Sequence, residues 1–119
     1  MDSLLEQVGG TPVVNRTVGE FYRAIGRHLT PYESCDHQKQ QVRQAQFLNH
    51  AFSSQPEPVR SSRASFLARG LNPALFEALL EYVGARLIEL GFSFQFSSHL
   101  VETAGDLYEH CEQDLFIAC

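Results

Sequence analysis

The side chains of this chain that could do chemistry are five histidines, three cysteines and scattered hydroxyl and carboxyl groups. One weak metal pattern is present, because His99 and Glu102 lie three residues apart on one face of an expected helix and His110 follows eight residues later. We predict no metal site, because the plainer interpretation makes solvated or capping residues of all five histidines: His28, His37, His50, His99 and His110. The sequence has neither a glycine-rich phosphate loop nor a context for a Ser-His-Asp triad, so no catalytic residue is expected.

The cysteines are odd in number and lack metal-type spacing, which indicates reduced thiols in a cytoplasmic protein. Cys111 follows Leu107 and Tyr108 at helical spacing, which predicts a small buried hydrophobe. Cys35 stands next to Asp36, and an acidic neighbour opposes a reactive thiolate.

The size and charge of the chain limit its function further. A chain of 119 residues predicts a single domain over residues 1–119 with one real core. The net charge of -5 and the single lysine, Lys39, argue against binding to nucleic acid or to anionic lipid. No run of 18 apolar residues and no secretory signal are present, so we expect no membrane span.

The elements that must position any site are helical almost throughout, because apolar residues recur at helical spacing. The capping pair at 11–12 predicts the start of a second helix after a short first one. Asp36 is a good N-cap for a helix that reaches Phe52, and the stretch at 53–62 (SSQPEPVRSS) predicts a surface loop.

The second half of the chain follows the same pattern. Gly70 is expected to end a short helical piece in the left-handed conformation. The Asn-Pro pair at 72–73 then starts the clearest helix. The stretch at 92–96 is interpreted as an apolar linker, and Ser97 or Ser98 as the cap of a last helix. The sequence thus predicts an all-α fold of five to six helices, either a four-helix bundle or a globin-like sandwich, and the long middle loop favours the sandwich.

Two segments resemble the truncated haemoglobin family. The first is 4–10 (LLEQVGG), followed at the family's spacing by Val13, Val14, Val18, Phe21 and Tyr22. The second is 68–91 (ARGLNPALFEALLEYVGARLIELG), which is similar to the family's G helix. The resemblance extends over nearly the whole chain and implies a truncated-globin-like helical sandwich.

The resemblance also implies a candidate binding site for haem. Tyr22 would point into the distal pocket and donate a hydrogen bond to a bound ligand, with Gln40 and Gln44 on the same distal face. Such hydrogen bonds contribute about 1 kcal/mol each. Phe47 and Phe76 would contact the macrocycle. The alternatives are a core tyrosine with a polar partner and two glutamines on an exposed helix surface.

The chain departs from the family at the proximal histidine, whose position carries Phe66, and no histidine lies between His50 and His99. Haem iron needs an axial ligand such as His, Cys, Met or Tyr, and Phe cannot be one. Because an empty cavity costs roughly 24 cal/mol per Å³, we predict that Phe66 fills the vacated space. Alternative ligands, each poorly placed, would be Tyr22, His37, His50 or His99.

Two functional classes remain. The favoured prediction is a globin-fold protein that has lost standard haem ligation and acts, without a cofactor, as a haem-free sensor, ligand-pocket or interaction protein. The alternative is a haem-binding truncated haemoglobin that binds oxygen or nitric oxide through an unusual axial ligand. A homodimer through the apolar segments at 92–96 and 115–117 is compatible with either class.

Overall fold

The computed structural model describes residues 3–24, 37–53 and 62–112. In these three ranges the chain is all-α, as predicted, and contains no strand. The six helices are α1 (Leu4–Val8), α2 (Thr11–Ala24), α3 (His37–Ser53), α4 (Ser62–Ala68), α5 (Pro73–Glu89) and α6 (Phe94–Glu112).

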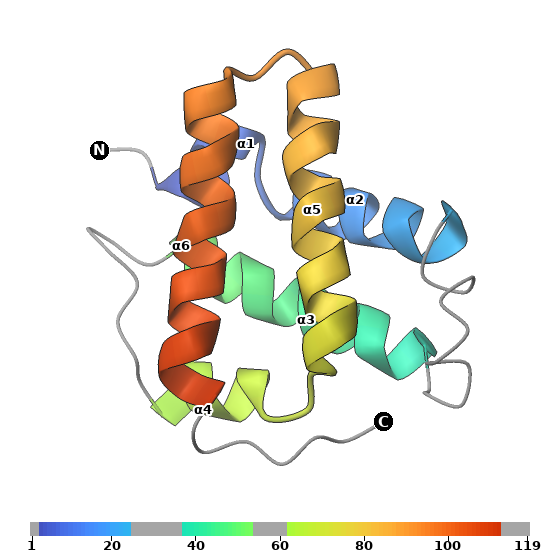
Figure 1. Ribbon diagram of the computed structural model, residues 1–119, viewed down its shortest axis with the longest axis vertical. Coiled ribbons are helices and arrows are strands. Elements are labelled where there is room, and N and C mark those ends of the chain that lie inside the picture. Colours follow the sequence, from blue (N-terminus) through green and yellow to red (C-terminus); the bar gives the residue numbers. More distant parts are fainter. Residues whose placement is uncertain (1–2, 25–36, 54–61, 113–119) are drawn as a thin grey trace.

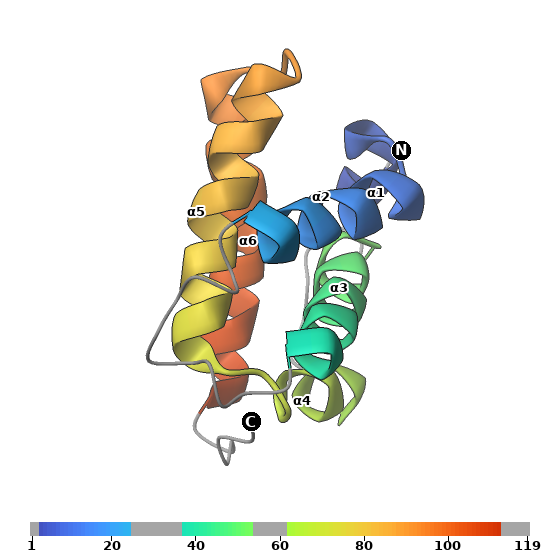
Figure 2. The same ribbon diagram turned by 90° about the vertical axis from the view of Figure 1, so that its right-hand side faces the viewer.

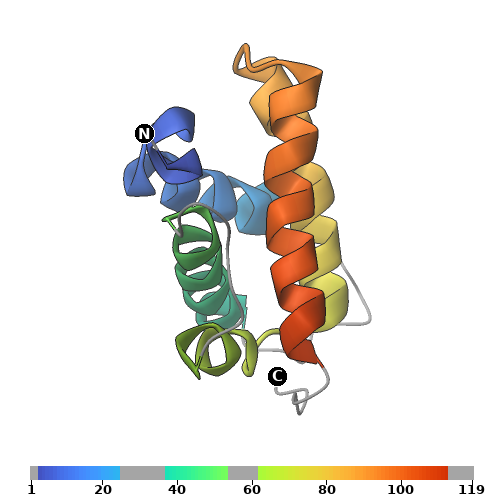
Figure 3. The same ribbon diagram turned by 90° about the vertical axis from the view of Figure 1, so that its left-hand side faces the viewer.

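The helices form two layers. α5 and α6 run antiparallel and pack along each other, and α2 and α3 form a second pair that crosses them (Figures 1 and 2). The short helices complete the α2–α3 layer: α1 packs on α2 and α3, and α4 lies against both α3 and α6 (Figure 3). One face of α3 therefore points into the molecule toward α6, and its opposite side borders α1 and α2.

Local signals explain where most helices begin. Gly10, at φ +90°, supplies the carbonyl that accepts from the amides of Val13 and Val14 at the start of α2. At the start of α5 the Asn72 side chain accepts from the amides of Ala74 and Leu75, as the Asn-Pro signal predicted.

Two local predictions were wrong. α6 begins at Phe94, inside the predicted apolar linker, because the Ser93 hydroxyl caps it by accepting from the Phe96 amide at 3.0 Å. Gly70 does not have a positive φ, so it is not a left-handed cap. A Cβ at Gly70 would lie 2.7 Å from the Arg43 guanidinium, so the glycine instead lets that side chain lie against the backbone.

The core lies between the two layers. Its largest fully buried rings belong to Phe21, Phe47, Phe52 and Phe76. Across the described ranges, no helix has both the length and the apolar character that a bilayer crossing requires.

Candidate functional site

Three polar residues predicted to share a site do lie together in the interior. Tyr22 on α2 is 6% exposed, and Gln40 and Gln44 on α3 are 2% and 0% exposed. The Tyr22 hydroxyl donates to Gln44 Oε1 at 2.7 Å, and Gln44 Nε2 donates to Gln40 Oε1 at 3.4 Å. The alternative of two surface glutamines is therefore wrong, and the three side chains form one buried hydrogen-bonded chain.

This chain of hydrogen bonds ends on the backbone between α4 and α5. Gln40 Nε2 donates to the Gly70 carbonyl at 2.8 Å, and the Asn72 amide donates to Gln40 Oε1 at 2.9 Å. One side chain thus satisfies a buried donor and a buried acceptor of the same turn. Gln40 consequently fixes α3 directly to the segment that follows α4.

The surroundings of Tyr22 are mainly aromatic. Its ring meets the Phe21 ring edge-on at 5.0 Å between centroids and lies 5.9 Å from the His37 ring. Burial raises the pKa of the Tyr22 hydroxyl above its ordinary value. The neutral phenol, which can donate to Gln44, is therefore the stable form.

Replacing Tyr22 by phenylalanine should change both stability and its pH dependence. Near pH 7 the variant should lose about 1–2 kcal/mol, because Gln44 Oε1 loses its donor. The raised folded-state pKa gives the wild type a stability contribution that is complete below about pH 10 and declines above it, where only the unfolded chain ionises Tyr22. In urea unfolding at a series of pH values, the two curves should converge above about pH 10. Curves that stay parallel there would contradict this assignment.

The two rings predicted to contact a macrocycle contact each other instead. The ring centroids of Phe47 on α3 and Phe76 on α5 lie 5.4 Å apart. Tyr108 on α6 completes the group, at 5.9 Å from Phe47 and 4.7 Å from Phe76. This aromatic trio joins α3 to α5 and α6, with no space for a further ring between Phe47 and Phe76.

The prediction that Phe66 fills a vacated proximal space is wrong. Its side chain is 62% exposed, whereas Ala64, Leu67 and Ala68 on the same short helix are buried. These buried positions repeat at helical spacing, i, i+3 and i+4, and Phe66 falls outside that stripe. This periodicity, read from the sequence, could have placed Phe66 on the surface.

These side chains do not fit haem in the position that the resemblance implies. Such a haem would lie between the distal glutamines and the segment that ends at Gly70, yet Gln40 bonds to that segment directly. The position of the proximal ligand carries Phe66, an exposed side chain without a ligating atom. We therefore derive no step through haem.

The remaining candidates have ordinary surroundings or lie outside the described residues. His99 and His110 are exposed, and His110 Nδ1 donates to the Asp106 carbonyl at 2.7 Å. Within the described ranges, no three His, Cys, Asp or Glu side chains gather as a metal ion would require. Cys111 is fully buried and is not in a disulfide, as its spacing predicted. Three candidates, His28, Cys35 and Cys119, fall outside the described residues.

The segment predicted to mediate a homodimer lies at the corner between α5 and α6. Phe94 is 69% exposed there, and Ile88 and Leu90 are each 47% exposed. The Phe92 and Phe96 rings stack at 5.2 Å between centroids. The corner is thus apolar and exposed, while the homodimer itself stays a prediction and residues 115–117 lie outside the described part.

No protein-family model, no curated protein and no solved structure matches this chain. The relation to truncated haemoglobins therefore stays a prediction from the residues. The site reasoning from sequence found Tyr22, Gln40 and Gln44, but it missed Gly70 and Asn72 as their partners. In the sequence, Gly70 indicates only the end of one helix and Asn72 only the start of the next.

Proposed function

We propose that this chain is a haem-free, globin-like protein that acts by binding another molecule and not by carrying a diatomic gas. The observation that supports this proposal is the direct bonding of Gln40 to the Gly70 carbonyl and the Asn72 amide. Haem between these groups would have to break both hydrogen bonds and leave buried backbone groups to find new partners.

The donors that would stabilise a bound gas are already in use. The Tyr22 hydroxyl has one proton to donate, and Gln44 Oε1 accepts it. Gln40 likewise donates to the Gly70 carbonyl and accepts from the Asn72 amide. A polar ligand in this region would have to compete with a network that is already satisfied.

Ligation of iron by Tyr22 is disfavoured for a related reason. The phenolate is the form of tyrosine that binds ferric iron, and burial raises the pKa of Tyr22 above its ordinary value. The same ring is held between Phe21 and His37, and its oxygen is held by Gln44. Coordination would require this packing to reorganise.

An absorbance titration with hemin tests the proposal. We expect the wild-type protein to give weak, unsaturable binding without a sharp Soret band, and Tyr22→Phe to behave in the same way. Phe66→His supplies an imidazole at the family's ligand position, but it should not restore binding because position 66 faces solvent.

Saturation at one equivalent with a sharp Soret band, lost in Tyr22→Phe or when one histidine is replaced by alanine, would overturn the proposal. That result would identify an axial ligand and establish the haem-protein alternative. Saturable binding that only Phe66→His shows would mean that the space between Gln40 and the segment ending at Gly70 can open to admit haem. That result also contradicts the proposal.

A further inference from the structure

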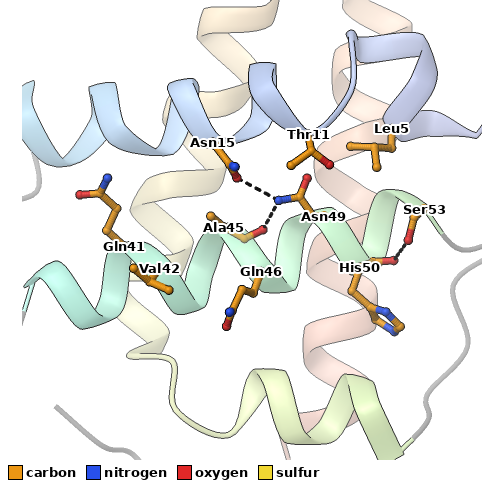
Figure 4. Close-up of a pocket in the computed structure, with 10 residues that line it drawn as sticks. All are labelled: Leu5, Thr11, Asn15, Gln41, Val42, Ala45, Gln46, Asn49, His50 and Ser53. Carbon is orange, nitrogen blue, oxygen red and sulfur yellow. Dashed lines mark hydrogen bonds between the residues drawn. The ribbon is translucent and has the colours of Figure 1, made fainter.

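A groove runs along the side of α3 that faces away from the buried hydrogen-bonded chain. It has a volume of about 640 Å³ and is lined by the outer face of α3 and by neighbouring residues of α1 and α2. This volume is within the range of about 300–1,000 Å³ that is typical of ligand sites. Asn49 points from α3 toward α2, whereas Gln46 and His50 point to the other side of α3 (Figure 4). Gln41 and Ser53 lie toward its two ends along α3, and Asn15 and Asn49 meet across it (Figure 4).

The lining of the groove combines polar side chains with apolar ones. None of the described residues that line it is Asp, Glu, Lys or Arg. Four of them carry carboxamides and two carry hydroxyls: Asn15, Gln41, Gln46, Asn49, Thr11 and Ser53. A carboxamide offers N–H donors and a carbonyl acceptor, the same groups that a peptide unit presents. Such a lining suits a ligand with neutral donors and acceptors.

Asn49, beside the groove, has one buried atom that still needs a donor, and a ligand reaches it only where the side chains around it move apart. Its Nδ2 donates to the Ala45 carbonyl at 2.8 Å and to Asn15 Oδ1 at 3.0 Å. Because a backbone carbonyl can only accept, these bonds fix which end of the carboxamide carries the nitrogen. The opposite atom, Oδ1, is buried and has no hydrogen-bond partner among the described residues. A buried acceptor in this state is unfavourable until a donor reaches it.

We propose that this groove binds an extended, uncharged peptide segment, whose backbone amides bond to the carboxamides of α2 and α3. This inference rests on the proposed binding function and names its ligand class. Gln41 and Ser53 are twelve residues apart on α3, which corresponds to ~18 Å at the helical rise. An extended peptide covers that length with ~5 residues.

The lining also separates a peptide from other polar ligands. A nucleic acid requires clustered positive charge for its phosphates, and the lining supplies none. A nucleobase or a sugar ring is usually held on an aromatic face, and His50 is the only ring among the described lining residues. Leu5, Val42 and Ala45 provide apolar surface for small side chains between the amide contacts.

The test is a titration of the full ¹⁵N-labelled chain with the capped peptide acetyl-Ala-Ser-Ala-Ser-Ala-amide. The side-chain amide signals of Asn15, Gln41, Gln46 and Asn49 report contact with the groove directly. These signals should shift and saturate together. The same peptide with every backbone amide methylated and a dimethylamide at its C-terminus has no N–H donors, and it should bind at least about tenfold more weakly.

Two variants locate the site. Asn49→Ala removes the buried acceptor, and Gln46→Ala removes an exposed carboxamide that the fold does not need. Each substitution should weaken peptide binding several-fold, and Asn49→Ala should weaken it about tenfold. The matched control Gln95→Ala, an exposed carboxamide on α6, should bind like the wild type.

The proposal is overturned if the four signals do not move, if the methylated peptide binds equally well, or if both groove variants bind like the wild type. Saturable shifts with glucose or adenosine, but not with the peptide, would overturn it in favour of a small-molecule site. Failure here is distinguishable from failure of the haem-free function, because hemin binding is measured separately and at the other side of α3.

Discussion

Replacing Gln40 by alanine should lower the free energy of unfolding by about 3–5 kcal/mol. The substitution takes a donor from the buried Gly70 carbonyl and an acceptor from the Asn72 amide. Each buried backbone group that loses its bond costs about 1–3 kcal/mol, and a small cavity adds to the loss. Urea unfolding measures the change, which is a large share of the 5–15 kcal/mol typical of a small domain.

Two companion variants separate the causes of that loss. Gln40→Met keeps most of the side-chain volume and removes only the hydrogen bonds. It should therefore still lower the free energy of unfolding by about 2–4 kcal/mol. Gln38→Ala changes the same residue type on the same helix at an exposed position, and it should cost less than about 0.5 kcal/mol. If Gln40→Ala were no worse than Gln38→Ala, these hydrogen bonds would not be what joins α3 to the turn after α4.

The parts of the fold that sequence could predict are those decided by neighbouring residues. The Asn-Pro pair at 72–73 starts α5 because an Asn oxygen and a Pro ring satisfy the requirements of a helix start within three residues. The convergence of Tyr22, Gln40 and Gln44 came from the resemblance and not from periodicity. α3 carries glutamines on both of its sides, and only tertiary packing decides which are buried.

The parts that sequence could not predict depend on contacts between distant segments. Nothing local to Gln40 indicates that it will bond to a turn 30 residues away. Phe66 is different, because its neighbours Ala64, Leu67 and Ala68 already marked the buried stripe. Helical periodicity decides the orientation of Phe66 there, and the cost of an empty cavity does not. Ser93 is hard to identify as a cap from sequence, because it lies between Phe92 and Phe94 in a run where Phe alternates with polar residues.

The carboxamide side chains on the two sides of α3 differ in whether their hydrogen bonds are satisfied within the fold. On the inner side, the carboxamides of Gln40 and Gln44 are saturated by Tyr22, Gly70 and Asn72. On the outer side, the carboxamides border an open groove, and Asn49 Oδ1 has no donor among the described residues. The inner set therefore contributes to folding, and the outer set is the one available to the proposed ligand.

Replacing Phe47 by alanine should lower the free energy of unfolding by about 3–5 kcal/mol. The ring is fully buried and meets both Phe76 and Tyr108, so its removal leaves a cavity at the point where α3, α5 and α6 join. Phe66→Ala is the matched control, because it deletes the same ring from a side chain that is 62% exposed, and it should cost less than about 0.5 kcal/mol.

The same pair of variants tests whether the aromatic trio of Phe47, Phe76 and Tyr108 occupies the space that a macrocycle would need. If the aromatic trio occupies the space that a macrocycle would need, benzene or xenon should raise the melting temperature of Phe47→Ala and leave that of Phe66→Ala unchanged, since an apolar cavity stays dry and accepts such ligands. If Phe66 were the filler, the order of the two losses and the response to xenon would be reversed. Thermal and urea unfolding of the two proteins with and without benzene distinguish these outcomes, because Phe47 is fully buried and Phe66 is exposed.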